Sequence, residues 1–312
     1  MNREQFKTIC KKTQAELKQY VVTKLKKHYD HIWVHKDFVY AEGTVPICLV
    51  AHLDTVHKEP PTLFIEEADR ISSPQGIGGD DRCGVYAILQ LIKKHNVSVL
   101  FCCDEEVGGI GALAFCSTSL AKQKEYQYLV ELDRKGKTDA VFYDCDNPQF
   151  TDFILKTGAW HEDFGSFTDI SQLAPEMGCA AVNLSCGYYD QHTLKEYVVP
   201  SEVDYCIDNV CKLIERTTSD DKFEYIEADY YQGYYGYKYK DYRGYNSYYY
   251  DDEETVFLIQ YETELGTTEY EEIEAISEYE AIGRFLVTHG NLTYNHIFGV
   301  LDESLYKTKS AK

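Results

Sequence analysis

The sequence lacks the features that would place it in a membrane or on a nucleic acid. No segment reaches the about 18 apolar residues of a membrane-spanning helix, and Met1 to Gln5 lack the apolar core of a signal peptide. Basic residues are few: 31 Lys and Arg stand against 52 Asp and Glu, so the net charge is −21. Because phosphate binding needs clustered Lys and Arg, a nucleic-acid partner is not expected. We expect a soluble protein with no membrane partner.

The eleven cysteines include no Cys-x-x-Cys pair, which argues against a zinc site built from cysteine. Their number is odd, and several lie within apolar stretches, namely Cys48, Cys102, Cys103 and Cys179. Buried thiols of this kind are typical of a reducing compartment and not of a disulfide framework. We therefore expect free cysteines and a cytoplasmic location.

Apolar runs alternate with segments of helical spacing through the first two thirds of the chain. Strands are predicted at 45–50, 97–103, 128–133 and 180–184. Helices are predicted at 4–28, 80–92, 150–157 and 201–216. This alternation is typical of a layered helix–sheet–helix α/β domain with a mostly parallel mixed sheet. We assign residues 1–218 to that domain.

Composition changes abruptly after Thr218. Residues 219–250 are rich in tyrosine, with glycine, lysine and aspartate between, and they lack an aliphatic pattern. We interpret them as a low-complexity linker, with a flexible tether favoured over an adhesive tyrosine-rich surface. We expect residues 1–218 to fold, and to keep their activity, without the rest of the chain.

The last part of the chain, 251–312, has secondary-structure signals of its own. Two strands joined at Gly266, a helix at 277–287 and a strand at 297–301 predict a small α+β module of ββαβ order. The module is strongly acidic, with 14 Asp and Glu against four Lys and Arg. We expect it to bind a protein partner or to aid solubility.

Acidic and histidine side chains occur where predicted strands end or helices begin. They are His52 with Asp54, Asp80 with Asp81, Glu105 with Glu106, Asp133, and His192. In an open α/β sheet, this edge is the usual place for an active site. Adjacent residues there point in different directions, so one of Glu105 and Glu106 can bind a metal while the other transfers a proton.

Two histidines and three carboxylates suit a pair of divalent ions in a site of mixed nitrogen and oxygen ligands. Zinc is the common metal for such a site, with cobalt and manganese as alternatives. Because the ligands are so few, we expect one of them to bridge the ions, which would lie about 3.5–4 Å apart. Such a pair can hold both the attacking and the leaving group of a hydrolysis.

Five motifs follow one another between residues 45 and 200. They are His52-Leu53-Asp54-Thr55, Gly78-Gly79-Asp80-Asp81-Arg82-Cys83-Gly84, Glu105-Glu106, Glu131-Leu132-Asp133 and Gly187-Tyr188-Tyr189-Asp190-Gln191-His192-Thr193. In this order they resemble the co-catalytic zinc exopeptidases, the clan that includes peptidase T, carboxypeptidase G and the bacterial zinc aminopeptidases. Each motif alone is loose, and the resemblance depends on their order and strand context.

The resemblance implies a ligand role for five residues. Asp80 would bridge the two ions. His52 and Asp133 would complete one metal site, and Glu106 and His192 the other.

The resemblance also implies two catalytic roles. Glu105 would be the general base that takes a proton from the attacking water and passes it to the leaving amine. Asp54 would orient the ring of His52, as carboxylates beside metal-bound histidines do.

Other polar residues near the motifs are weaker candidates. Substrate contacts are considered for Arg134, Tyr188 and Tyr189. An ion pair is the alternative for Arg134, and packing is the favoured interpretation of the tyrosines. Asp81 and Asp169 are interpreted as carboxylates at helix starts, with Asp169 solvated.

One feature departs from the family pattern. Peptidase T and carboxypeptidase G carry a lid domain between the metal-binding Asp and the last His, whereas residues 134–191 here are needed for the core fold. The substrate groups and dimer contacts of that lid therefore cannot be transferred to this chain. Without a lid, the chain is more similar to the aminopeptidase branch.

Together with the residues themselves, the resemblance implies a metal-dependent exopeptidase of short peptides, with an aminopeptidase favoured. One alternative is an amidohydrolase that removes the acyl group of N-acyl amino acids. Another is a metal-binding scaffold without turnover, but Glu105 beside a complete ligand set argues against it, because a scaffold needs no general base.

Overall fold

The computed structural model describes residues 1–228, 255–263, 267–275, 285, 289 and 297–302. The chain divides into two compact units, Met1–Tyr237 and Lys238–Lys312. Within the described residues, no helix combines the length and the apolar character that crossing a membrane requires. All eleven cysteines are free, and all but Cys116 are buried, as the sequence predicts.

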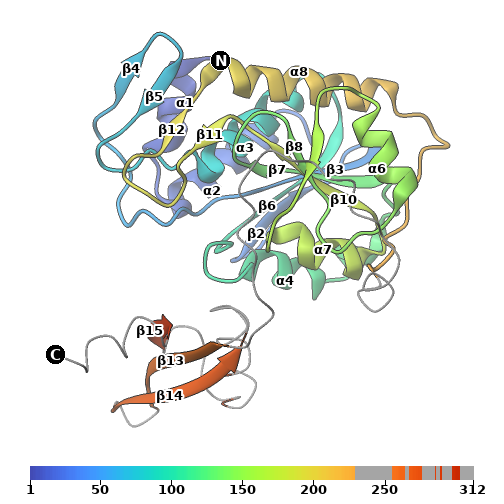
Figure 1. Ribbon diagram of the computed structural model, residues 1–312. Helices are drawn as coiled ribbons and strands as arrows, with labels where there is room; N and C mark the ends of the chain where they lie inside the picture. The colour runs from blue at the N-terminus through green and yellow to red at the C-terminus, as the bar shows by residue number, and fades with distance from the viewer. Residues whose placement is uncertain (229–254, 264–266, 276–284, 286–288, 290–296, 303–312) are drawn as a thin grey trace, which may run out of the picture. The chain divides into compact units, whose positions relative to one another are not determined.

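The first unit is built on an eight-stranded mixed sheet of order β1-β2-β6-β3-β7-β10-β8-β9 (Figure 1). The strands are β1 (Ile32–Val34), β2 (Phe38–Ala41), β3 (Val45–His52), β6 (Val97–Cys102), β7 (Tyr128–Arg134), β8 (Asp139–Val141), β9 (His161–Asp163) and β10 (Ala181–Ser185). The central four strands, β6, β3, β7 and β10, run parallel. The predicted α/β class with a mostly parallel mixed sheet is thus confirmed.

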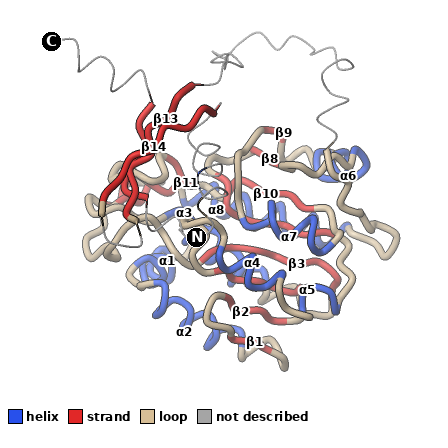
Figure 2. The backbone as a smooth tube through the Cα atoms, turned by 90° about the horizontal axis from the view of Figure 1, so that it is seen from below, coloured by secondary structure: helices blue, strands red, loops and turns tan. Residues whose placement is uncertain are grey.

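Helices cover both faces of this sheet (Figures 1 and 2). One face packs against α1 (Arg3–Cys10), α2 (Gln14–Leu25), α3 (Gly79–Leu91), α6 (Pro148–Leu155) and α8 (Pro200–Arg216). The other face packs against α4 (Ile110–Cys116), α5 (Leu120–Gln123) and α7 (Asp169–Met177). The central strands are therefore buried on both sides, which explains their nearly continuous apolar sequences.

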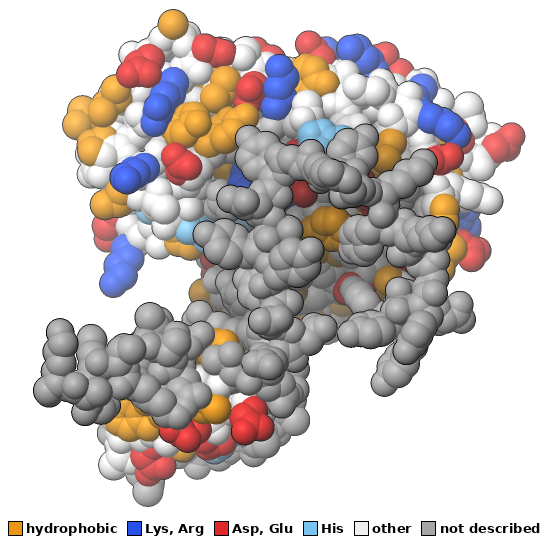
Figure 3. Space-filling view, in the orientation of Figure 1, with side chains coloured by type: hydrophobic (Ala, Val, Ile, Leu, Met, Phe, Trp, Pro, Cys, Tyr) orange, Lys and Arg blue, Asp and Glu red, His pale blue; other side chains and the backbone are white. Residues whose placement is uncertain are grey.

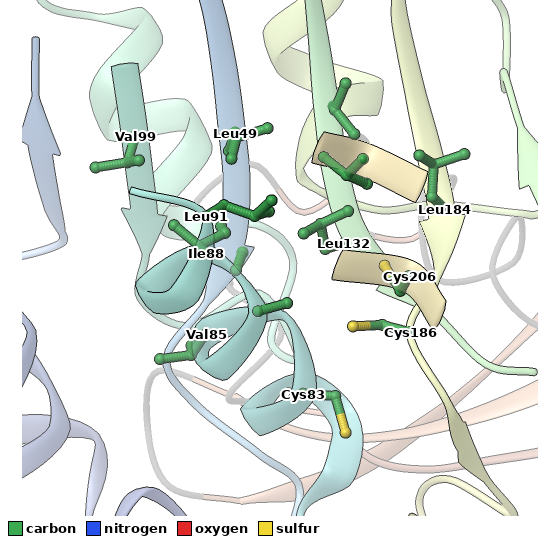
Figure 4. Close-up of a cluster of buried hydrophobic side chains, with 14 of the residues drawn as sticks. Leu49, Cys83, Val85, Ile88, Leu91, Val99, Leu132, Leu184, Cys186 and Cys206 are labelled. Carbon is green, nitrogen blue, oxygen red and sulfur yellow. The ribbon is translucent and has the colours of Figure 1, made fainter. Parts of the chain in front are cut away.

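The centre of the larger core lies between α3 and the parallel strands (Figure 4). Ile88 and Leu91 of α3 are fully buried with Leu49 of β3, Val99 of β6 and Leu132 of β7. This packing holds the first turn of α3 at the carboxyl ends of the strands.

The predicted helix at 4–28 is two helices, and that expectation was wrong. Thr13 caps α2: its hydroxyl oxygen accepts a hydrogen bond from Glu16 N, and the Glu16 side chain accepts one from Thr13 N. This reciprocal capping box begins a new helix.

A small second sheet, of order β11-β12-β5-β4, adjoins the first turn of α3. Its strands are β4 (Ile65–Glu67), β5 (Arg70–Ser72), β11 (Tyr188–Tyr189) and β12 (Tyr197–Val198). The loop between β11 and β12 carries His192, so this sheet places that histidine.

Residues 134–191 belong to the core, as expected from the absence of a lid. They form the end of β7, the strands β8, β9, β10 and β11, and the helices α6 and α7. All the strands of this segment except β11 lie in the main sheet.

The first unit continues beyond Thr218. Phe223 N donates to Gln127 O at 2.9 Å, and Phe223 O accepts from Ala180 N at 3.0 Å. The ring of Phe223 lies 5.2 Å from that of Phe150, and Ala228 N donates to Asp144 O at 2.9 Å. We therefore propose that the first unit extends at least to Ala228 and does not end at Thr218.

A chain that ends at Ala228 is expected to be soluble and to unfold cooperatively. A chain that ends at Thr218 should lose about 1–3 kcal/mol of stability, because it exposes the surface that Phe223 covers. Thermal unfolding of the two chains beside the full chain measures the difference. Equal melting temperatures for the two truncations would show that residues 219–228 add nothing to the domain.

The second unit contains a three-stranded antiparallel sheet of order β14-β13-β15. The strands are β13 (Thr255–Glu262), β14 (Thr268–Ala275) and β15 (Ile297–Asp302). They match the three strands expected for the module, and β14 contributes to the acidic side chains gathered on this unit (Figure 3). The predicted linker beyond Ala228 and the helix expected at 277–287 lie outside the described residues, apart from single positions.

Candidate metal centre and active site

The five candidate ligands, far apart in the sequence, meet at the carboxyl end of the central strands. His52 ends β3, Asp133 lies near the end of β7, and Asp80 lies at the start of α3. Glu106 follows β6, and His192 comes from the loop after β11. The parallel strands bring these ends to one edge of the sheet.

The carboxylate of Asp80 lies between the two histidines. Its Oδ1 is 3.0 Å from Nε2 of His52, and its Oδ2 is 3.2 Å from Nε2 of His192. His52 Nε2 is also 3.6 Å from Asp133 Oδ1, and His192 Nε2 is 3.1 Å from Glu106 Oε2. The two oxygens of Asp80 thus face two different groups of side chains, which is the arrangement that a bridging carboxylate requires.

The side chains present fit divalent ions. The ligand atoms of His52, Asp80 and Glu106 all lie within 4.8 Å of one another, as do those of His52, Asp81 and Asp133. Oε1 of Glu106 is buried and has no hydrogen-bond partner in the described part of the chain. Burial and the charge of Asp80 raise the pKa of Asp133 to about 7. A divalent ion would offset this crowding of negative charge.

Asp54 holds two parts of the site together. Its Oδ1 lies 3.2 Å from Nδ1 of His52. Its two oxygens also accept hydrogen bonds from the backbone N–H groups of Glu105 and Glu106, each at 3.0 Å. The contact with His52 agrees with the predicted orienting role, and the contacts with the Glu105-Glu106 turn were not anticipated.

Glu105 is partly buried beside the ligands. Burial, with the negative charges of Asp133, Asp169 and Glu106, raises the pKa of Glu105 to about 9. A divalent ion nearby would lower that pKa, because a positive charge favours the ionised carboxylate. A carboxylate whose pKa responds to charge in this way can accept and release a proton near neutral pH.

Asp81 is fully buried and bonds backbone groups. Its Oδ1 accepts from Gly84 N at 2.8 Å, which agrees with its interpretation as a helix-start carboxylate. Its Oδ2 accepts from His52 N at 3.2 Å and so ties the start of α3 to the end of β3.

The three residues considered for substrate contact each bond another side chain of this protein. Arg134 pairs with Asp163, which is the ion pair that the sequence left open. Tyr188 is buried, and its hydroxyl donates to Asp133 Oδ1 at 3.0 Å. The hydroxyl of Tyr189 donates to Glu202 at 2.6 Å and not to any of the five candidate ligands.

Sequence reasoning missed Glu196, a buried residue in the β11–β12 loop. Its Oε1 accepts from Asp80 N and its Oε2 from Gly78 N, both at 2.9 Å, so it holds the backbone that carries Asp80. A single Glu in a loop gives no signal of this contact.

Two further carboxylates, those of Glu131 and Asp169, are buried near Asp133. The hydroxyl of Thr168 is 2.8 Å from Glu131 Oε2 and 3.2 Å from Asp133 Oδ2. Asp169 is fully buried and not solvated, so that interpretation was wrong, and burial raises its pKa to about 7. Glu131 could have been found from the sequence, because strand residues two positions apart point to the same face.

Among solved structures, the first unit has the fold of aminopeptidases. It is similar to the aminopeptidase PepT from Bacillus cereus, with a TM-score of 0.56 and 13% identity over 68% of this chain and 96% of that chain. A tripeptidase from Staphylococcus aureus gives a TM-score of 0.56 and 11% identity over 67% and 96%. An aminopeptidase from the archaeon Desulfurococcus kamchatkensis gives 0.53 and 17% over 70% and 95%.

These similarities show that the first unit shares its fold with aminopeptidases, in agreement with the fold that the sequence motifs imply. No protein-family model and no curated protein matches the sequence.

Proposed function

We propose that this chain is a metal-dependent exopeptidase of short peptides, and specifically an aminopeptidase. The observation that carries the proposal is the position of Asp80. Its two carboxylate oxygens face His52 and His192 separately, while Glu105 lies beside the same cluster. The likeness in fold to aminopeptidases supports this assignment.

In this proposal, five side chains would hold two divalent ions. One set is His52, Asp80 and Asp133, and the other is Asp80, Glu106 and His192. Zinc is the first choice, with cobalt and manganese as alternatives. When bound, such ions polarise the peptide carbonyl and make water more acidic.

The chain's own residues transfer the proton of the attacking water. Glu105 accepts this proton on its carboxylate and delivers it to the leaving amine. Asp54 keeps Glu105 in place through the backbone N–H group of that residue, and the Tyr188 hydroxyl holds Asp133. Because all its thiols are free, we place the protein in the cytoplasm.

A panel of matched free and N-acetylated peptides, with added zinc, cobalt or manganese, tests the function. Free di- and tripeptides should be cleaved, and their acetylated forms should not, because an aminopeptidase needs a free amine. A chelator should abolish cleavage, and elemental analysis should give two metal ions per chain. Cleavage of acetylated substrates alone would favour the amidohydrolase. Metal binding without cleavage of any substrate would favour the metal-binding scaffold without turnover.

A further inference from the structure

The side chain of Gln14, at the start of α2, clamps a residue 90 positions away. Its Nε2 donates to Oδ1 of Asp104 at 2.8 Å, and its Oε1 accepts from Asp104 N at 3.0 Å. Both ends of one amide are thus bonded to the backbone and the side chain of one residue. Gln14 lies outside the five motifs, and within the described residues its side chain makes no hydrogen bond to Glu105 or to a candidate ligand.

Asp104 sets the direction in which the chain leaves β6. Its φ of 58° lies in the left-handed region, which residues other than glycine, asparagine and aspartate rarely adopt. Its carbonyl accepts from Ile110 N at 3.1 Å, and the carbonyl of Glu105 accepts from Gly108 N at 2.9 Å. The turn that begins at Asp104 therefore determines where Glu105 and Glu106 lie.

The start of this turn, Asp104 to Glu106, is held from two sides, and Gln172 Nε2 donates to Gly108 O at 3.2 Å further along. Asp54 bonds the N–H groups of Glu105 and Glu106 from the sheet side, and Gln14 bonds Asp104 from the side of α2. A cavity of about 540 Å³ adjoins the turn and is lined by Gln14, Asp104 and Glu106 among others. Because open space and not packed side chains lies there, the hydrogen bonds of Gln14 limit the movement of the turn.

The helix that carries Gln14 is firmly anchored. Leu17, Val21 and Leu25 of α2 are fully buried, and the Thr13–Glu16 capping box closes its first turn. Gln14 therefore projects from a rigid support, as a residue that orients an active-site loop requires.

We propose that Gln14 is a positioning residue that holds the Glu105-Glu106 turn in its working geometry. The inference rests on the proposed function for its catalytic consequence, because a displacement of about 1 Å in an active site can cost about 10²-fold in rate. The clamp itself is testable without turnover.

The test compares Gln14→Met, which keeps the length of the side chain and loses both hydrogen bonds, with Gln19→Ala on the exposed side of the same helix. Gln14→Met should lower kcat about 10–100-fold and change KM less than about threefold. Its melting temperature should equal that of Gln19→Ala. Amide hydrogen exchange at 104–110 should become faster in Gln14→Met alone, while α2 stays protected.

An exchange of donor and acceptor provides a rescue. Gln14→Glu places a carboxylate next to Asp104 and should disturb the turn as Gln14→Met does. Adding Asp104→Asn should restore protection and turnover, because the asparagine amide can donate to the new carboxylate and asparagine tolerates the left-handed conformation.

Wild-type kcat and exchange in Gln14→Met would overturn the proposal, as would faster exchange throughout α1 and α2, which would indicate a purely structural role. Failure of the double variant to recover would also contradict it. If the wild-type protein cleaved no peptide, the proposed function would fail, whereas the exchange measurements would still decide whether the clamp exists.

Discussion

Replacing Glu105 with glutamine is expected to lower kcat about 10²–10⁴-fold while the protein keeps both metal ions. The amide has the shape of the carboxylate but cannot take a proton from water. Because Glu105 is not among the proposed ligands, elemental analysis should find the metal content of the wild type. Hydrolysis of the best peptide from the panel measures the loss.

The neighbouring Glu106→Gln variant is the matched control. It makes the same chemical change one position along the chain, but it weakens a proposed ligand. We expect it to lose metal as well as activity, so the two variants should differ in metal content. Full activity of Glu105→Gln would show that another group is the base.

Replacing Asp80 with alanine is expected to empty both metal sites together and to abolish hydrolysis. The carboxylate of Asp80 is 3.0 Å from His52 and 3.2 Å from His192, so both proposed sites lose a ligand at once. The loss of metal affinity should exceed the about 10–100-fold that follows replacement of an outer-shell partner. Titration of the metal-free protein with zinc measures it.

Asp133→Ala serves as the comparison. Of the two histidines, His52 is the one that lies close to Asp133. This variant should bind one metal ion more weakly and bind the other with unchanged affinity. If Asp80→Ala still bound one ion with unchanged affinity, Asp80 would not bridge the two sites. Circular dichroism should show that both variants remain folded.

The main elements and the five-residue cluster could be predicted because their signals are local. A buried parallel strand appears as a continuous apolar run, and the polar residue that follows it must lie at the edge of the sheet. His52, Glu106 and Asp133 were found in this way. The break after Cys10 also has a local signal, the capping box of Thr13 and Glu16, but the apolar periodicity continues across it and predicts one helix.

The sequence by itself determined the α/β architecture and which side chains lie at the carboxyl end of the central strands. Both follow from periodicity and strand ends. Only the tertiary structure decided how these side chains are supported. Glu196 under Asp80 and Gln14 against Asp104 join segments about 90 to 120 positions apart. Hydrogen bonds of this kind depend on the packed positions of two separate elements, and no spacing along the chain encodes them.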